Sequence, residues 1–170
     1  MKPFIAVMLF CLSTLSYGET RDVSKFFDQN LGDLKSELAT AKNEGKKAVL
    51  IMFEAEDCPF CHRMKSTILN QSEVQDFYDK NFLVFSMDIN GDNPLVDFFG
   101  QETTEKAYAR LNRVRATPVF AFFDLEGKLI TRYTGATKDT KEFLKLGQYI
   151  IEGAYKGMTF TKYKSLPGRL

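Results

Sequence analysis

Residues 48–65 read AVLIMFEAEDCPFCHRMK, and this stretch decides the fold. Its first six residues form a continuous apolar run, which is typical of a strand covered on both faces. A helical pattern begins at Pro59 and continues to Leu69. Pro59 suits the first helical position because it has no amide hydrogen to leave unpaired, so Cys58 is expected at the N-cap. The sequence therefore predicts a buried strand, a short turn, and a helix that begins at the first of two cysteines.

This placement favours redox chemistry at Cys58 and Cys61. The amides and the macrodipole of a helix N-terminus stabilise an anion, which lowers the pKa of the Cys58 thiol and makes it a nucleophile. Cys61 follows one helical turn later, so it can release a mixed disulfide that Cys58 forms with a substrate. Two alternatives stay open from the motif alone. One is an inert structural disulfide, and the other is half of a zinc site, for which His62 is the only further Cys or His after residue 18.

Outward from this stretch, apolar periodicity predicts alternating helices and strands without a repeat or a linker. Ser72 and Gln75 suggest a capping box at the start of one short helix, and residues 124–127 (Asp-Leu-Glu-Gly) mark a hairpin turn. The order calls for one α/β domain with a central mixed sheet and helices on both faces. The predicted elements are a helix through Leu31, Leu34, Leu38 and Ala41 that ends at Gly45, a strand over 48–53, a helix over 59–69, a helix from Ser72 to Asp79, a strand over 82–89, a long connection over 90–115 with a helical core at 103–111, strands over 118–123 and 128–133, and a last helix that opens at Asp139.

The first 18 residues differ from the rest of the chain. A lysine precedes an apolar run over 4–12, and no acidic residue occurs before position 19. These features predict a secretory signal peptide with cleavage after Gly18, which also removes Cys11. The apolar run is about half of the ~20 residues that a membrane span needs. We therefore predict a signal peptide over 1–18, a single domain over 19–170, and export to an oxidising compartment, the periplasm.

The charges of the chain are balanced, with 23 Lys and Arg against 22 Asp and Glu. A nucleic-acid-binding surface needs an excess of basic side chains to neutralise phosphates. We therefore expect no nucleic-acid partner.

The region around the cysteines and the segment over 116–120 (Ala-Thr-Pro-Val-Phe) resemble the active-site turn and the cis-proline segment of the thioredoxin superfamily. With Asp88 at the end of the next strand and the long helical insertion before the proline, the chain looks most like exported thioredoxin-related proteins of the SoxW type. The resemblance covers nearly all of residues 19–170. It implies a thioredoxin-like fold and a thiol–disulfide oxidoreductase whose catalytic residues are Cys58 and Cys61.

The same resemblance implies where a substrate binds. In that family the residue before the cis-proline lies against the cysteines, and its backbone pairs with the substrate chain as an added strand, which carries over to Thr117 and Pro118. Phe60, between the cysteines, is expected to face partners. Pro59 and His62 are expected to tune the thiols, His62 through its charge. No cofactor or metal is expected.

Two positions depart from the family pattern. Thioredoxins commonly place a buried Asp six residues before the first cysteine, where it helps to deprotonate the resolving thiol, and this chain has Met52 there. Asp57 stands where the family usually has Trp, and its charge opposes a thiolate on Cys58. We therefore expect Cys58 to be moderately rather than extremely reactive.

The resemblance also implies the direction of electron flow and the partners. Proteins of the SoxW type keep the thiols of exported clients reduced, so the expected partners are client proteins with disulfides and a membrane-embedded electron donor. Disulfide isomerases usually carry a dimerisation domain, for which residues 19–170 leave no room. We therefore expect a monomer that acts as a reductant.

Two other classes of function use the same residues. Cys58-Pro-Phe-Cys61-His62 matches the C-x-x-C-H signature of covalent haem attachment. A c-type cytochrome normally presents this motif near the start of a small helical domain, which does not fit the strand-rich second half of the chain. A binding module that carries copper(I) on Cys58, Cys61 and His62 is the third candidate. A Soret band, bound copper, or neither would separate the three.

Overall fold

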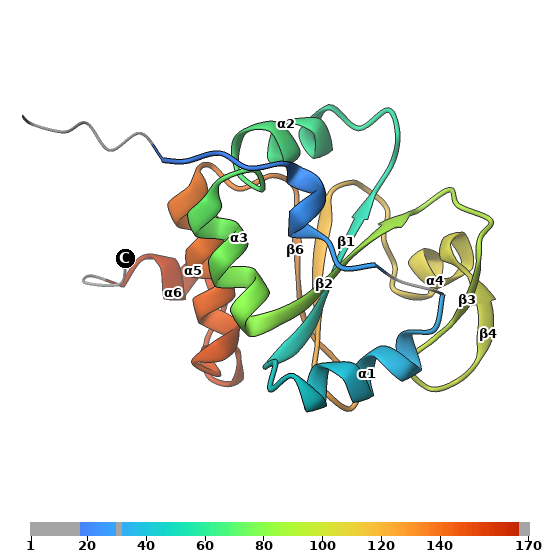
Figure 1. Cartoon of the computed structure of the whole chain (residues 1–170). Helices are drawn as coiled ribbons and strands as arrows, with labels where there is room; N and C mark the ends of the chain where they lie inside the picture. Colours follow the sequence, from blue (N-terminus) through green and yellow to red (C-terminus); the bar gives the residue numbers. More distant parts are fainter. Residues whose placement is uncertain (1–17, 30–31, 167–170) are drawn as a thin grey trace, which may run out of the picture.

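The structure is a computed structural model that describes residues 18–29 and 32–166. Its centre is a four-stranded sheet in the order β2 (Phe82–Asp88), β1 (Ala48–Glu54), β5 (Val119–Phe123) and β6 (Leu129–Thr134) (Figure 1). β1 is parallel to β2 and antiparallel to β5, and β5 is antiparallel to β6. The first six residues of β1 are all buried, as the apolar run predicts.

Helices cover both faces of this sheet (Figure 1). Side chains at alternate strand positions point to opposite faces, so neighbouring residues of β1 enter different cores: Met52 belongs to one hydrophobic cluster and Ile51 to the other. The first cluster includes residues of α2 (Pro59–Thr67), α3 (Ser72–Asn81) and α5 (Thr140–Ile151), and the second includes residues of α1 (Leu34–Asn43) and α4 (Glu105–Leu111). The predicted α/β architecture, a mixed sheet between two layers of helices, is confirmed.

The predicted capping box is wrong. Helix α3 begins at Ser72 itself, and its N-cap is Gln71, which makes no side-chain cap hydrogen bond. The buried side-chain amide of Gln75 instead donates hydrogen bonds to the carbonyl oxygens of Asp22 and Leu69, each at 3.0 Å. The residue that would complete the capping box therefore anchors the segment that precedes α1.

The connection between β2 and β5 contains the predicted helix, α4, and also a small sheet that periodicity did not predict. Strands β3 (Pro94–Val96) and β4 (Glu102–Thr104) pair as an antiparallel hairpin. Phe98, between them, is buried with its ring centroid 4.9 Å from that of Phe123, whereas Phe99 is 63% exposed. Three-residue strands are too short to show a period of two, so the sequence pattern does not predict this hairpin.

Short helices occur at both ends of the described chain. The 3-10 helix η1 (Val23–Phe26) precedes α1, and η2 (Ala154–Lys156) and α6 (Phe160–Lys164) follow α5. None of the helices in the described ranges is long and apolar enough to cross a membrane. The predicted signal peptide falls outside the described residues except for Gly18.

Candidate functional site

The cysteines lie where the sequence predicts, at the start of α2. Cys58 is the N-cap, Pro59 follows it as the first helical residue, and a disulfide joins Cys58 to Cys61 with 5.2 Å between their Cα atoms. The backbone amide of Cys61 donates a hydrogen bond to the Cys58 sulfur at 3.1 Å. The backbone amide of His62 donates to the Cys58 carbonyl at 3.1 Å. The first turn of the helix is therefore built around the Cys58 sulfur, the place where a helix N-terminus favours negative charge.

Strand β1 fixes the position of this turn. It ends at Glu54, and the amide of Cys58 then donates to the carbonyl of Ala55 at 3.3 Å, which closes a tight turn between strand and helix. Cys61 is 1% exposed and Cys58 is 5% exposed. Both cysteines belong to the same hydrophobic cluster as Met52. Cys58 is therefore the slightly more accessible of the two residues.

The proline segment reaches the same end of the sheet. The Thr117–Pro118 peptide bond is cis. Val119 pairs with Phe53 of β1 in the antiparallel register, so Pro118 lies opposite the end of β1, from which the cysteine turn departs. The Pro118 carbonyl accepts a hydrogen bond from the amide of Gly135 at 2.8 Å. The structure thus places Thr117 and Pro118 at the end of the sheet that carries the cysteines, with Pro118 buried and Thr117 partly exposed.

Phe60 and His62 project from the helix start into different surroundings. Phe60 is 59% exposed. The Nε2 atom of His62 is hydrogen-bonded to the carbonyl oxygen of Glu56 at 2.9 Å. His62 also lines a cavity of about 410 Å³ with Glu56 and Asp88. The imidazole is therefore held on the β2 side of the cysteine turn by a backbone carbonyl.

Met52, which stands where thioredoxins commonly bury an Asp, has a fully buried side chain. The nearest acid in sequence on β1 is Glu54, and its carboxylate is already paired. Lys65 Nζ lies 2.6 Å from Glu54 Oε2, and the hydroxyl of Ser86 donates to Glu54 Oε1. Only 16% of the Glu54 side chain is exposed. The carboxylate therefore links β1, β2 and α2.

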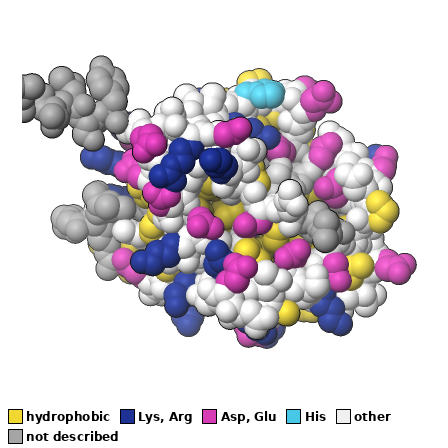
Figure 2. All heavy atoms as spheres, in the orientation of Figure 1, with side chains coloured by type: hydrophobic (Ala, Val, Ile, Leu, Met, Phe, Trp, Pro, Cys, Tyr) yellow, Lys and Arg dark blue, Asp and Glu magenta, His cyan; other side chains and the backbone are white. Residues whose placement is uncertain are grey.

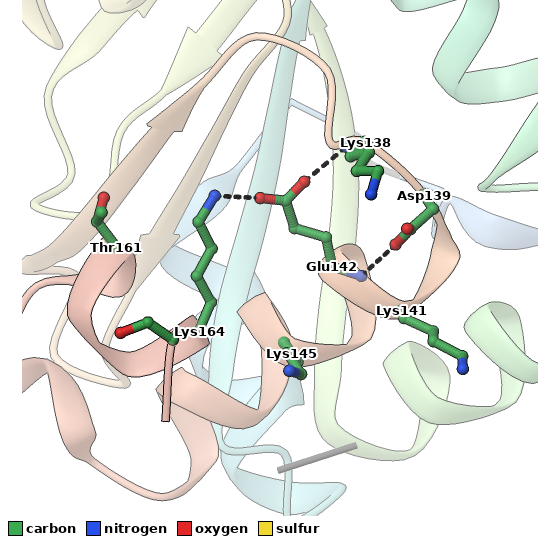
Figure 3. A pocket seen from close by; sticks show the side chains of 8 residues that line it. Lys138, Asp139, Lys141, Glu142, Lys145, Thr161 and Lys164 are labelled. Carbon is green, nitrogen blue, oxygen red and sulfur yellow. Dashed lines mark hydrogen bonds and ion pairs between the residues drawn. The ribbon is translucent and has the colours of Figure 1, made fainter. Parts of the chain in front are cut away.

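A second cavity, of about 560 Å³, lies between α5 and α6 (Figure 3). At its centre the Glu142 carboxylate accepts hydrogen bonds from the backbone amide of Lys138 at 2.6 Å and from Lys164 Nζ. Figure 3 shows the side chains of Lys141 and Lys145 pointing away from this carboxylate rather than toward a common point. Within the described ranges, no group of three or more His, Cys, Asp or Glu side chains could hold a metal ion. Acidic and basic side chains are interspersed over the face in Figure 2.

Comparisons with known proteins agree with this geometry. Residues 34–151 match the family model of the thioredoxin-like domain. A thioredoxin-fold protein from Helicobacter pylori is similar with a TM-score of 0.65 and 21% identity, covering 84% of this chain and 90% of that chain. A thioredoxin from Thermus thermophilus has a TM-score of 0.54 and 28% identity, covering 72% and 88%.

The C-terminal domain of DsbD from Neisseria meningitidis, in its oxidised form, has a TM-score of 0.52 and 23% identity, covering 69% of this chain and 92% of that chain. The comparison with curated proteins gives no significant match. The family model spans the sheet, the cysteine turn and the proline segment. The chain therefore belongs to the thioredoxin-like family.

Proposed function

We propose that the protein is a thiol–disulfide oxidoreductase that reduces disulfides in exported client proteins through Cys58 and Cys61. The observation that carries the proposal is the disulfide at the N-cap of α2, with the Cys58 sulfur accepting a hydrogen bond from the Cys61 amide. In the reduced protein the same amide and the helix N-terminus would favour a thiolate on Cys58, which makes it the nucleophile. The similarity to a thioredoxin at 28% identity supports this chemistry.

The reaction takes place in two exchange steps. The Cys58 thiolate attacks one sulfur of the client disulfide, and the other client sulfur leaves as a thiolate that takes up a proton. The Cys61 thiol then loses its proton and attacks the Cys58 sulfur, which releases the second client thiol and forms the Cys58–Cys61 disulfide. Two electrons pass from the dithiol to the client, so a separate dithiol donor must reduce the disulfide again.

Export, the donor and the subfamily are parts of the same proposal. The features of residues 1–18 support a periplasmic protein. The resemblance of the sequence to exported proteins of the SoxW type supports a monomer that is reduced by a membrane-embedded donor. Thr117 and Pro118 would bind the client backbone, and Phe60 would contact its side chains. Pro59 and His62 would tune the thiols. The buried strand directly before the cysteines favours the dithiol over haem attachment, and the carbonyl-bound Nε2 of His62 weakens the copper(I) reading.

Trapping the intermediate tests the chemistry. The wild-type protein should catalyse dithiothreitol-dependent reduction of insulin, and Cys58→Ala should abolish catalysis. Cys61→Ser should accumulate mixed disulfides with clients because release needs the second thiol. A non-reducing gel should show these adducts, and treatment of the sample with reductant should remove them. Retention of full activity by Cys58→Ala would overturn the mechanism.

The reduction potential of the couple tests the direction of electron flow. We expect a value between about −200 and −270 mV, the range from glutaredoxins to thioredoxin, because the helix start favours the thiolate while Asp57 opposes it. Equilibration with glutathione or dithiothreitol mixtures measures it. A value near ~−120 mV, that of a strong oxidant, would reverse the assignment from reductant to oxidant.

A further inference from the structure

Three arginines line a cavity of about 250 Å³ next to the proline segment. Arg113 and Arg115 come from the connection between α4 and β5, and Arg132 comes from β6. Ala116, directly before the Thr117–Pro118 bond, is another of its lining residues. The cavity is therefore adjacent in the chain to the segment where we propose that clients bind. We call these three side chains the arginine cluster.

The backbone at Arg113 is unusual for an arginine. Arg113 has φ 55°, and it is the only residue other than glycine with a positive φ in the described ranges. Its amide donates to the Arg110 carbonyl at 2.9 Å and the amide of Val114 donates to the Ala109 carbonyl at 3.0 Å. This pattern ends a helix with one left-handed residue, a position that glycine usually occupies. Arginine rather than glycine occupies this position here.

Arg132 connects the cluster across the fold. Its Nη1 atom donates a hydrogen bond to the carbonyl oxygen of Asn112, the residue before Arg113. This contact brings the guanidinium of Arg132, which lies on the edge strand β6, to the end of α4. In the described ranges, the five ion pairs involve other cations: Arg21, Lys46 twice, Lys65 and Lys164. Within these ranges no carboxylate pairs with the arginine cluster, and its exposed charges are available to a partner.

The register of the strands places opposite charges on the two sides of the cysteine turn. On the β2 side, Glu54 pairs in register with Asp88, and both line the cavity that also contains Glu56. Lys65 and His62 line the same cavity, and Lys65 is paired with Glu54, so the acidic character of this side comes from Glu56 and Asp88. On the other side, Val119 of β5 pairs with Thr134 of β6, and both line the cavity of the arginine cluster. A chain that crosses this end of the sheet therefore passes from an acidic side to a basic side.

We propose that the arginine cluster selects client disulfides that have Asp or Glu residues within a few positions of the reacting cysteine. The inference rests on the proposed function, because it names the substrate class of the same site. A planar guanidinium binds a carboxylate through two parallel hydrogen bonds, and three of them next to the proline segment would hold an acidic stretch of an extended client. The cluster also attracts such a client from solution, an effect that salt screens.

Peptides with one disulfide and different charges test this selection. Three peptides of equal length carry Asp and Glu, Lys and Arg, or Ser and Gln beside the reacting cysteine, and stopped-flow measures their reduction by the pre-reduced protein. At low salt we expect the acidic peptide to react about tenfold faster than the basic one, with the ratio falling toward one at high salt.

Two double variants separate the cluster from net charge. R113G/R115Q removes two charges, and glycine relieves the backbone at position 113, so the fold is preserved. The ratio of the acidic to the basic rate should fall to about threefold or less. K141Q/K145Q removes two charges from α5, which packs on the other face of the sheet from Val119, a residue that lines the cavity of the arginine cluster. This variant should keep the wild-type ratio. Circular dichroism and thermal unfolding confirm that both variants fold.

Each outcome decides between the two proposals. Equal rates for the three peptides with the wild-type protein would overturn the selection by charge and leave the oxidoreductase intact. An unchanged ratio in R113G/R115Q, or an equal loss in K141Q/K145Q, would also overturn the role of the arginine cluster. If none of the peptides is reduced, the neutral one included, the proposed function itself fails.

Discussion

Replacing Met52 by Asp tests whether the core beside the cysteines can hold a charge. Met52 is fully buried, in the cluster that contains Cys58, Cys61 and Phe120. Thioredoxins commonly bury an Asp at this position, whereas this chain has built an apolar environment there. Met52→Asp should therefore remove packing and also leave a carboxyl group without a compensating hydrogen bond.

The size of the effect follows from burial. Truncation of a buried methionine costs about 2–5 kcal/mol of unfolding free energy, and an unsatisfied buried polar group adds about 1–3 kcal/mol. Burial raises the pKa of the new carboxyl group above its value in the unfolded chain, about 3.9. Between these two pKa values the folded state holds the proton more tightly, so the unfolding free energy falls by about 1.4 kcal/mol for each pH unit of increase.

Denaturant unfolding of the oxidised protein at pH 5 and pH 8 measures both parts. Met52→Asn has nearly the same size as the Asp variant but no charge, so its loss of stability should be nearly independent of pH, and the difference between the two variants should grow with pH. Met52→Leu conserves volume and should cost less than about 1.5 kcal/mol. If the Asp and Asn variants are equally stable at pH 8, a carboxylate is tolerated at this position and the reasoning is refuted.

Two further predictions concern α5 and its neighbours. Gly147→Ala should lower the melting temperature because the new Cβ would lie 2.4 Å from Phe77 Cε1, although Ala gains about 1 kcal/mol over Gly in a helix. Gly157→Ala is the control, since no atom lies within 4 Å of its Cβ. An equal melting temperature for the two variants would contradict the steric argument. Lys164→Met should lower the unfolding free energy by less than about 1 kcal/mol at pH 7. Burial raises the pKa of Glu142, but hydrogen bonds from Lys164 and a backbone amide lower it on balance. The contribution of the ion pair is therefore present above the pKa of Glu142 in the unfolded chain, and it is lost as the pH falls through the pKa of Glu142 in the folded protein. Urea unfolding from pH 7 to pH 2 measures it, and a difference from the wild type that persists at pH 2 would contradict the ion pair.

The amino-acid sequence is enough to predict the elements that depend on local signals. Twelve residues, from Ala48 to Pro59, contain the apolar run of β1, the N-cap Cys58 and the first helical residue Pro59. They can be read locally because strand burial and helix capping act between near neighbours in the chain. The same holds for Asp139, whose carboxylate accepts from the amide of Glu142 at 2.9 Å at the start of α5. These signals are enough to place both cysteines and to predict their chemistry.

The tertiary structure alone decided features that join distant segments. The prediction of Gln75 as a capping residue fails because one of its two hydrogen-bond acceptors, the Asp22 carbonyl, lies 53 positions away in the chain. The sequence does not predict the arginine cluster, because Arg132 joins it only when β6 lies beside the end of α4. The only local signal is Arg-Val-Arg at 113–115, shortly before the Thr117–Pro118 bond. A local pattern records which backbone conformation a segment prefers, whereas a binding surface depends on which remote side chains the packed core brings together.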